Sequence, residues 1–270
     1  MTLYWIYELP TWAMGLVVIL AFLLPSLLGL LVVRTWIYRS FGLSDDTNES
    51  VNGFVAATGM LYGLLLGLVA VATWQNYDAA NTLASKEASS VAALYQDVSA
   101  FPEPERQKLQ AHLENYLSYV IDVAWPAHQV GEIPRGGTVI LAKFQGVLSA
   151  FQPKTPNQQV ILAEALSAFN TLVEARRMRM DSVTSGLPSV FWVVIVAGAV
   201  LSIALTYAVH LASWRAHLIL TGVFSLFVGL LIFLVAALDN PFRGELSVSA
   251  DSYKLVLQSL QDLDSSKHAN

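Results

Sequence analysis

Residues 54–74, FVAATGMLYGLLLGLVAVATW, form an apolar run without a charged side chain. A helix of about 20 apolar residues crosses the hydrocarbon core of a bilayer, so this run predicts a transmembrane helix. Within it, Gly59, Gly63 and Gly67 recur at intervals of four residues and therefore share one helix face. Each glycine lowers helix stability by roughly 1 kcal/mol relative to alanine. Three glycines on one face therefore indicate that the surroundings of this face favour small residues.

Three other runs have the same character: Ala13–Val33, Ser189–Leu211 and Ala216–Leu238. The 270-residue chain is 55% hydrophobic and 13% charged, and its mean hydropathy is +0.53. Soluble domains are about 25% charged, so the composition predicts an integral membrane protein in the lipid bilayer. The net charge of −5 argues against nucleic acid as a partner. The chain has no cysteine, which excludes disulfides and thiolate metal sites.

The four runs divide the chain into a first transmembrane hairpin at 13–74, a polar segment at 75–187, a second hairpin at 189–238 and a tail at 239–270. The polar segment holds 9 Lys and Arg and 11 Asp and Glu side chains, which is typical of a solvated region of balanced charge. We therefore predict an extramembrane helical stalk domain at 75–187. The tail contains an amphipathic stretch, with Tyr253, Val256, Leu257 and Leu260 on one face, which predicts a helix.

Helix-breaking residues are absent from 68 to 100, and the apolar spacing stays helical across this range. The sequence therefore predicts one helix from about Gly53 to Ala100, which leaves the membrane and enters the stalk. Further helices are expected at 104–125, 138–151 and 157–185. The Pro- and Gly-containing stretch 125–137, WPAHQVGEIPRGG, is expected to be a loop. The predicted fold is an all-α membrane protein with four transmembrane helices, of which spans two and three extend into the extramembrane domain.

Charges beside the membrane give two opposite indications of orientation. Four spans place both termini and the stalk on one side. The positive-inside rule favours the cytoplasm for that side, whereas the first span alone, with positive charges only after it, argues the reverse. We expect the stalk and the termini to be cytoplasmic. The stalk side carries Arg176, Arg177, Arg179, Arg243 and the more distant Lys86, and the hairpin side carries Arg34, Arg39 and Arg215.

Three stretches resemble a known family: NGFVAATGMLYGLLLGLVAVATWQNYDAA at 52–80, RRMRMDSVTSGLPSVFW at 176–192 and LDNPFRGELSVS at 238–249. They are similar to the bestrophin-like domain-of-unknown-function family of bacterial membrane proteins. The resemblance covers nearly the whole chain and implies the inner membrane of a bacterium. Bestrophins are pentameric anion channels with four spans per subunit and a cytosolic helical domain. The calcium-binding acidic cluster of animal bestrophins has no counterpart here.

The glycine face of Gly59, Gly63 and Gly67 allows two interpretations. Small residues at four-residue spacing let two helices approach closely, within a subunit or between subunits. Alternatively, copies of this span surround an axis, and the glycines line a pore. Small residues in spans three and four offer partners within the chain for the first interpretation; they are Gly198, Ser202, Gly222, Ser225 and Gly229.

Three charged residues of the stalk are expected at similar heights above the membrane. Glu87 lies 13 residues after Trp74, and Arg176 and Arg179 lie 13 and 10 residues before Ser189. In an antiparallel helix pair, Glu87 can therefore form an ion pair with Arg176 or Arg179. The pair is either a clamp that fixes helix register or part of a basic vestibule that gathers anions.

Several residues at the ends of the spans belong to the quoted motifs. Trp74 and Trp192 are expected to anchor the helices at the membrane interface. Asp239 can accept backbone hydrogen bonds there, and Pro241 ends the fourth span; gating is the alternative role for this motif. The whole set of interface residues is Trp74, Asp78, Pro188, Trp192, Asp239, Pro241, Phe242 and Gly244.

The predicted spans contain no Asp, Glu, Lys or Arg, which argues against a proton-coupled transporter. A passive pore needs no such group, because hydrophobic constrictions can gate by dewetting. The five histidines are scattered, and no catalytic, phosphate-binding or metal-binding motif is present. We therefore predict a homo-oligomeric, bestrophin-like channel for inorganic anions, without catalytic activity, cofactor or metal. The alternative is a non-transporting membrane scaffold or signalling protein whose stalk binds a partner protein.

Overall fold

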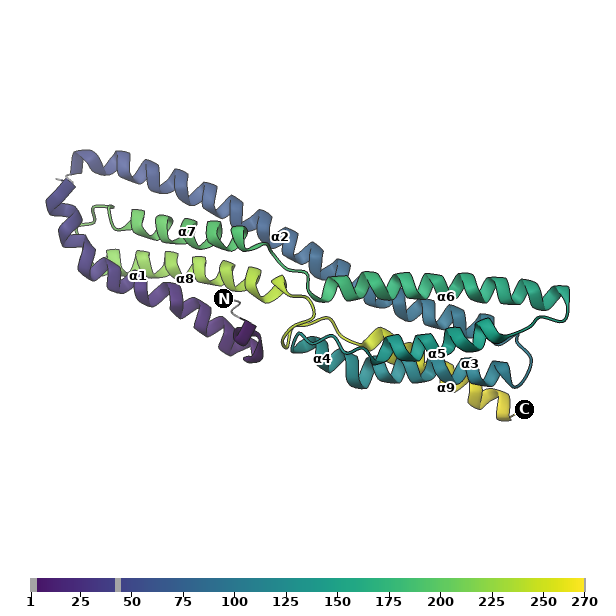
Figure 1. Ribbon diagram of the computed structural model, residues 1–270. Helices are drawn as coiled ribbons and strands as arrows, with labels where there is room; N and C mark the ends of the chain where they lie inside the picture. Colours follow the sequence, from purple (N-terminus) through teal and green to yellow (C-terminus); the bar gives the residue numbers. More distant parts are fainter. Residues whose placement is uncertain (1–3, 42–44, 270) are drawn as a thin grey trace. The chain divides into compact units, whose positions relative to one another are not determined.

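The computed structural model describes residues 4–41 and 45–269, and all regular structure within them is helical (Figure 1). After a short 3-10 turn at Tyr4–Glu8, the long helices are α1 (Thr11–Phe41), α2 (Asp45–Val98), α3 (Glu105–Tyr119), α5 (Gly136–Ala150), α6 (Pro156–Val183), α7 (Ser189–Thr206), α8 (Trp214–Asp239) and α9 (Asp251–Ala269). Among the described residues, four helices are long and apolar enough to cross a membrane: α1, α2, α7 and α8. The predicted all-α membrane fold is confirmed.

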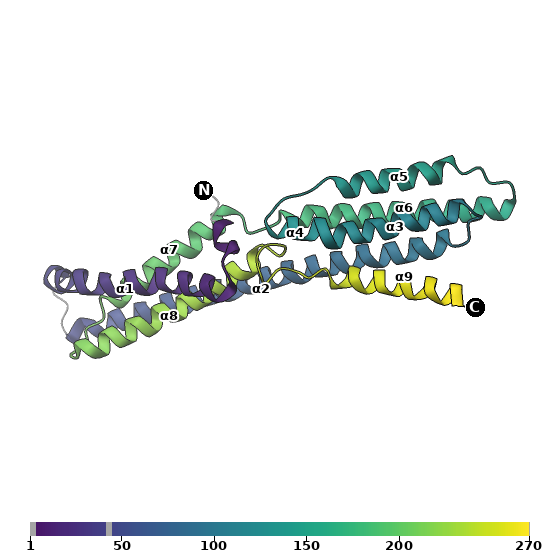
Figure 2. The same ribbon diagram turned by 90° about the horizontal axis from the view of Figure 1, so that it is seen from below.

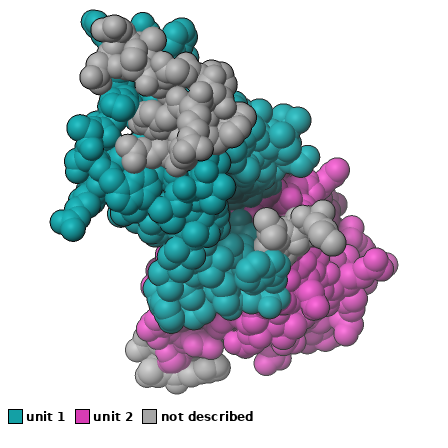
Figure 3. Space-filling view, turned by 90° about the vertical axis from the view of Figure 1, so that its left-hand side faces the viewer, with its two compact units in different colours: residues 1–76, 186–239 teal, residues 77–185, 240–270 magenta. Residues whose placement is uncertain are grey.

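The chain divides into two compact units, which Figure 3 colours separately. The first comprises residues 1–76 and 186–239, and the second comprises residues 77–185 and 240–270. Helix α2 contributes to both, and it is one unbroken helix from residue 45 to residue 98. The long helix predicted through the end of span two is therefore confirmed. It begins earlier than expected, before Gly53.

In the first unit, α1 and α8 lie side by side (Figures 1 and 2). Gly229 of α8 makes this possible, because a Cβ atom there would lie 3.1 Å from the Cα atom of Ile19 in α1. A buried serine pair joins the same helices: the Ser225 hydroxyl donates to the Ser26 hydroxyl. Small residues of α8 are thus used to contact α1.

Helix α2 packs in this unit through one face only. Its Tyr62, Leu66, Val69 and Thr73 are buried at three- and four-residue spacing, as expected for one stripe of a helix. Gly198 of α7 lies against the Tyr62 ring, where a Cβ atom would come within 2.6 Å of a ring carbon. The Tyr62 hydroxyl donates to the carbonyl of Ile195 at 2.9 Å, which further ties α2 to α7.

The second unit is a helical bundle in which α3, α5 and α6 run alongside one another with the later part of α2 and with α9 (Figures 1 and 2). Thr155 caps α6, since its hydroxyl accepts the N–H of Gln158 at 3.2 Å, and Pro156 occupies the first turn. The buried core draws on every helix of the unit and includes Val91, Leu94, Leu113, Phe144, Leu148, Phe169, Leu172 and Tyr253.

The stretch expected to be a loop at 125–137 is partly helical, and this prediction was wrong for residues 125–129 and for Gly136 and Gly137, with which α5 begins. After α3, a π-helical turn at Val120–Ala124 leads directly into α4 (Trp125–Gln129). Pro126 lies in the first turn of α4, directly after the π-helical turn. The third span is also shorter than expected, since α7 ends at Thr206 and not at Leu211.

Candidate functional site

The second unit contains a fully buried ion pair between Glu87 of α2 and Arg179 of α6. Their side chains are 0% and 1% exposed. The Arg179 Nε atom donates to Glu87 Oε2 at 2.6 Å, and Nη2 donates to Oε1 at 3.3 Å. Two parallel hydrogen bonds between a guanidinium and a carboxylate fix direction as well as distance. The pair therefore sets the rotation of both helices.

Each partner lies on the buried stripe of its helix. Glu87 is adjacent to Ala88 and one turn after Ala84, and both alanines are buried. On α6, the residues one and two turns before Arg179 are the buried Ala175 and Leu172. Small alanine side chains leave room for the long arginine to lie inside the bundle.

Two more polar side chains complete the cluster around the pair. The Tyr116 hydroxyl of α3 donates to Glu87 Oε1. The Arg179 Nη1 atom lies 3.3 Å from His128 Nδ1. A guanidinium has only donors, so Nδ1 accepts and the proton of this neutral imidazole is on Nε2. His128 Nε2 is itself buried without a hydrogen-bond partner among the described residues.

The pKa shifts follow from burial next to opposite charges. Burial, assisted by the positive charges of Arg179 and Arg176, lowers the pKa of His128 to about 3. Burial and the Glu87 carboxylate raise the pKa of the Tyr116 and Tyr253 hydroxyls well above their usual range. Burial acts to lower the pKa of Arg179, but the Glu87 carboxylate outweighs it and raises that pKa. At neutral pH the cluster holds one negative and one positive charge.

Aromatic rings enclose the guanidinium. Its central carbon lies 5.4 Å from the Trp125 ring centroid and 5.9 Å from that of Tyr253, within the range of cation–π attraction. Phe242 meets Trp125 edge to face at a centroid distance of 5.6 Å. The Trp125 indole N–H donates to the carbonyl of Val248 at 2.8 Å. Residues 240–253 therefore cover the ion pair.

The three stalk charges singled out from the sequence have different environments. Glu87 pairs with Arg179. Arg176 is only partly buried, and its guanidinium donates to the Thr138 hydroxyl at 3.1 Å. Because Arg179 is buried, its guanidinium does not face solvent. The geometry is that of a closed clamp between α2 and α6.

Sequence reasoning missed the other members of this cluster. Tyr116 was expected only on the apolar face of its helix, and His128 was one of five scattered histidines. Trp125 and His128 lie directly after the π-helical turn, which shifts the helix face by an extra residue. No sequence pattern indicates such a turn. The aromatic content of 125–128 and 242–253 was the only available signal.

The glycine face of α2 does not contact the rest of the described chain. Cβ atoms placed at Gly59, Gly63 and Gly67 would have no atom of another described segment within 4 Å. The small residues of spans three and four were expected to pack against Gly59, Gly63 and Gly67, which we call the glycine ladder, but they have other roles. Gly198 accommodates the Tyr62 ring, and Gly222 and Gly229 face α1. The expected contact within the chain is therefore absent from the part that the structure describes, because α2 turns its Tyr62 face to α7.

The interface residues fall into two groups. Asp239, at the end of α8, accepts the backbone N–H of Leu187 with Oδ1 and the Trp192 indole N–H with Oδ2. Asp239 thereby joins the end of α8 to residues on both sides of Pro188, which immediately precedes α7. Trp74 and Asp78 are exposed on α2.

The other group belongs to the segment after α8. Pro241 and Phe242 are buried, and the Pro241 carbonyl accepts the Val248 N–H at 2.8 Å. Gly244 has a φ angle of +74°, a conformation that favours glycine, and this allows the tight turn. This part of the motif therefore folds back over Trp125. Among the described residues, no three His, Cys, Asp or Glu side chains are grouped to hold a metal.

Comparisons with known proteins agree with this architecture. A crystal structure described as a membrane protein has a TM-score of 0.66 at 12% identity, over 92% of this chain and 97% of that chain. A variant of a bacterial bestrophin homologue from Klebsiella pneumoniae has a TM-score of 0.65 at 12% identity, over 93% of this chain and 98% of that chain. At this identity the likeness shows a shared fold.

A comparison with curated proteins gives no match. A family model described as "Bestrophin-like domain", in contrast, matches residues 20–253. Since that match covers most of the sequence, the chain belongs to the Bestrophin-like domain family.

Proposed function

We infer that copies of this chain assemble into a homo-oligomer that forms a passive channel for inorganic anions. The observation that carries this proposal is the free face of α2. The glycine ladder has no partner within the described chain, and the side chains beside it, Met60, Leu64 and Leu68, are 77%, 59% and 63% exposed. In membranes, small residues at this spacing favour close helix contact. A second copy of the chain provides such a contact, and a ring of copies places the glycines around an axis.

Three features support passive conduction. The chain belongs to the Bestrophin-like domain family, which is named for its likeness to the bestrophin anion channels, and the fold matches that of a bacterial bestrophin homologue. The predicted spans contain no Asp, Glu, Lys or Arg, and their only histidines, His210 and His217, lie at span ends, whereas proton-coupled transport usually needs ionisable groups inside the membrane. The buried Glu87–Arg179 ion pair belongs to the second unit, and neither partner is a residue of a predicted span. The proposal also takes 75–187 as an extramembrane domain on the cytoplasmic side of a bacterial inner membrane.

The test is an efflux assay with the full-length protein in liposomes. Chloride or nitrate release is measured with an ion-selective electrode, and empty liposomes give the background. We expect release above the background that is faster than release of a large organic anion such as gluconate. Liposomes with protein that are no leakier than empty ones, across pH, calcium concentration and voltage, would contradict the channel and favour a scaffold.

The glycine face is tested with Gly63→Leu, at the centre of the ladder. A side chain larger than alanine keeps close helices apart, so we expect a change in anion flux together with weaker assembly on size-exclusion chromatography. Gly63→Ala should have a smaller effect, since it adds one methyl group and improves helix propensity. Gly53→Leu is the matched control, because Gly53 also has no described neighbour but lies outside the ladder. Equal behaviour of both leucine variants would mean that the ladder faces lipid.

A further inference from the structure

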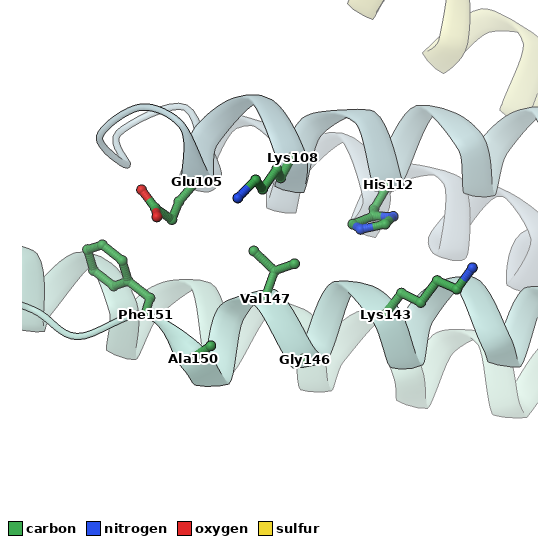
Figure 4. A pocket seen from close by; sticks show the side chains of 8 residues that line it. All are labelled: Glu105, Lys108, His112, Lys143, Gly146, Val147, Ala150 and Phe151. Atoms are coloured by element: carbon green, nitrogen blue, oxygen red, sulfur yellow. The ribbon is translucent and has the colours of Figure 1, made fainter.

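The second unit contains an open pocket between the beginning of α3 and the end of α5 (Figure 4). Its volume is about 440 Å³, which is within the range of small-molecule sites. The α3 side contributes Glu105, Lys108 and His112, and the α5 side contributes Lys143, Gly146, Val147, Ala150 and Phe151. Neither the buried ion pair nor the glycine face of α2 is part of this pocket.

The charged side chains of the pocket have an excess of one positive charge. Lys108 and Lys143 are cationic, and Glu105 is the only carboxylate in the lining. Neither lysine forms an ion pair with any residue whose side chain the structure describes. Figure 4 shows the Lys108 side chain beside α3 with its nitrogen directed toward Glu105. Glu105 and Phe151 lie at one end of the pocket, and His112 and Lys143 lie at the other.

His112 adds a polar group without adding charge. Its side chain is partly buried, and burial together with the positive charge of Lys143 lowers the pKa of its imidazole. The neutral ring has one N–H donor and one acceptor. The end of the pocket formed by His112 and Lys143 therefore presents N–H donors to a ligand, and one of the two groups is charged.

The rest of the lining is apolar. Val147, Ala150 and Phe151 form one wall, and Val147 points into the pocket (Figure 4). Gly146 leaves this wall open, because a Cβ atom there would have no described atom within 4 Å. Phe151 is held in place by Phe101, with ring centroids 4.9 Å apart. A flat apolar body can lie on this wall while an anionic group meets the donors.

We propose that this pocket binds a small monocarboxylate with a flat apolar body, such as an aromatic carboxylate. The carboxylate meets His112 and Lys143 at one end, and the apolar body covers Val147, Ala150 and Phe151. Glu105 opposes a second negative charge at the other end, so a doubly charged anion of the same size binds more weakly. This is a ligand site in the second unit, separate from any path for inorganic ions through the spans.

The test uses the full-length protein in nanodiscs and para-fluorobenzoate as the probe. Fluorine NMR line broadening gives the dissociation constant. We expect Lys143→Gln to raise it about tenfold or more, since a hydrogen bond to a charged group contributes about 1.5–3 kcal/mol. Lys108→Gln should raise it less, because the Lys108 nitrogen is directed toward Glu105. Gly146→Leu should abolish binding by filling the wall. Lys86→Gln is the matched control, because Lys86 is an exposed lysine of the same unit outside the pocket, and it should leave the dissociation constant unchanged.

Three related probes identify the recognised chemistry. Para-fluorobenzyl alcohol lacks the charge, para-fluorobenzylammonium reverses it, and para-fluorophenyl phosphate carries more of it. All three should bind more weakly than the benzoate. Equal broadening by the alcohol, or broadening that persists in Gly146→Leu, would mean partition into lipid and would overturn the proposal. Stronger binding of the phosphate would overturn the choice of a monocarboxylate. Circular dichroism of each variant confirms that the helices are intact, so a loss of binding reports the site.

Discussion

The ion pair between Glu87 and Arg179 joins α2 to α6, and both charged side chains are buried away from water. Removing one partner leaves the other charge buried, which typically destabilises a protein by about 3–5 kcal/mol. We therefore expect Arg179→Met to lower the free energy of unfolding by about this amount, as measured by chemical denaturation with circular dichroism. Arg177→Met is the control, because Arg177 is exposed on the same helix and its loss should change the free energy by less than about 0.5 kcal/mol.

The coupling within the pair is a separate prediction. Replacing both charges, as in Glu87→Leu with Arg179→Met, removes the uncompensated charge and should recover much of the lost stability. A double-mutant cycle measures this coupling, and residues in direct contact show interaction energies of about 0.5–3 kcal/mol. Additive effects of the two substitutions would show that the charges do not depend on each other.

His128 makes the second unit sensitive to acid. Its pKa is about 3 in the folded protein and about 6.5 in an unfolded chain, so the unfolded state binds the extra proton between these values. Stability is therefore fully present above about pH 6.5 and falls as the pH decreases towards 3, by up to about 1.4 kcal/mol per pH unit. Between pH 6.5 and 5, we expect the wild type to lose about 1.6 kcal/mol more than His128→Gln. Equal losses in denaturation curves at the two pH values would contradict a buried neutral imidazole.

Part of this cluster could be predicted from the sequence, and part could not. Counting residues from the membrane gives the heights of Glu87, Arg176 and Arg179, because helix rise is constant. The choice between the two arginines depends on helix rotation, and three residues turn a helix by about 300°. Rotation is set by the apolar stripe of α6, on which Arg179 lies and Arg176 does not. Tyr116 and His128 come from other helices, so only the packed structure brings them to the pair.

At the scale of helices, glycines inside the apolar spans have different surroundings. Gly198 of α7 is required inside the chain, since a Cβ atom there would collide with the Tyr62 ring at 2.6 Å. We expect Gly198→Leu to destabilise the first unit by about 1–3 kcal/mol, as overpacked cores do, with a lower melting temperature of purified protein in detergent. Gly63→Leu should leave that temperature unchanged under conditions where the protein is monomeric. A similar loss in both variants would mean that Gly63 also has a neighbour within its own chain.

Helix boundaries follow from the sequence where strong signals exist. Thr155 and Pro156 form a capping residue followed by proline, and α6 begins there. The absence of Pro and Gly from 68 to 100 predicts that α2 continues beyond span two. The π-helical turn at Val120–Ala124 has no such signal, so the prediction placed a loop where α4 continues the chain. Likewise, apolar composition extends beyond Thr206, and residues 207–211 contain no Pro or Gly that would mark the end of α7.

At the scale of the molecule, orientation is open to a direct experiment. The chain has no cysteine, so single cysteines can be introduced and labelled without removing others. If the second unit is cytoplasmic, Ala212→Cys, in the turn between α7 and α8, should react with a membrane-impermeant maleimide in intact bacterial spheroplasts. Ser149→Cys, on α5, should react only after the membrane is permeabilised. The reverse pattern would place the second unit outside the cell and would follow the indication from the first span.

The second unit is discontinuous in sequence, and this has a consequence for biosynthesis. Glu87 and Arg179 are translated early, but Phe242, Val248 and Tyr253, which cover them, leave the ribosome only after the fourth span. Domains generally fold in the order of synthesis, yet here an early helix pair has to wait for a late segment. Until then, the guanidinium and the Trp125 indole remain uncovered on one side. A message truncated between codons 239 and 242 would therefore produce all four spans and an unfinished second unit, and such a product is a natural substrate for membrane proteases.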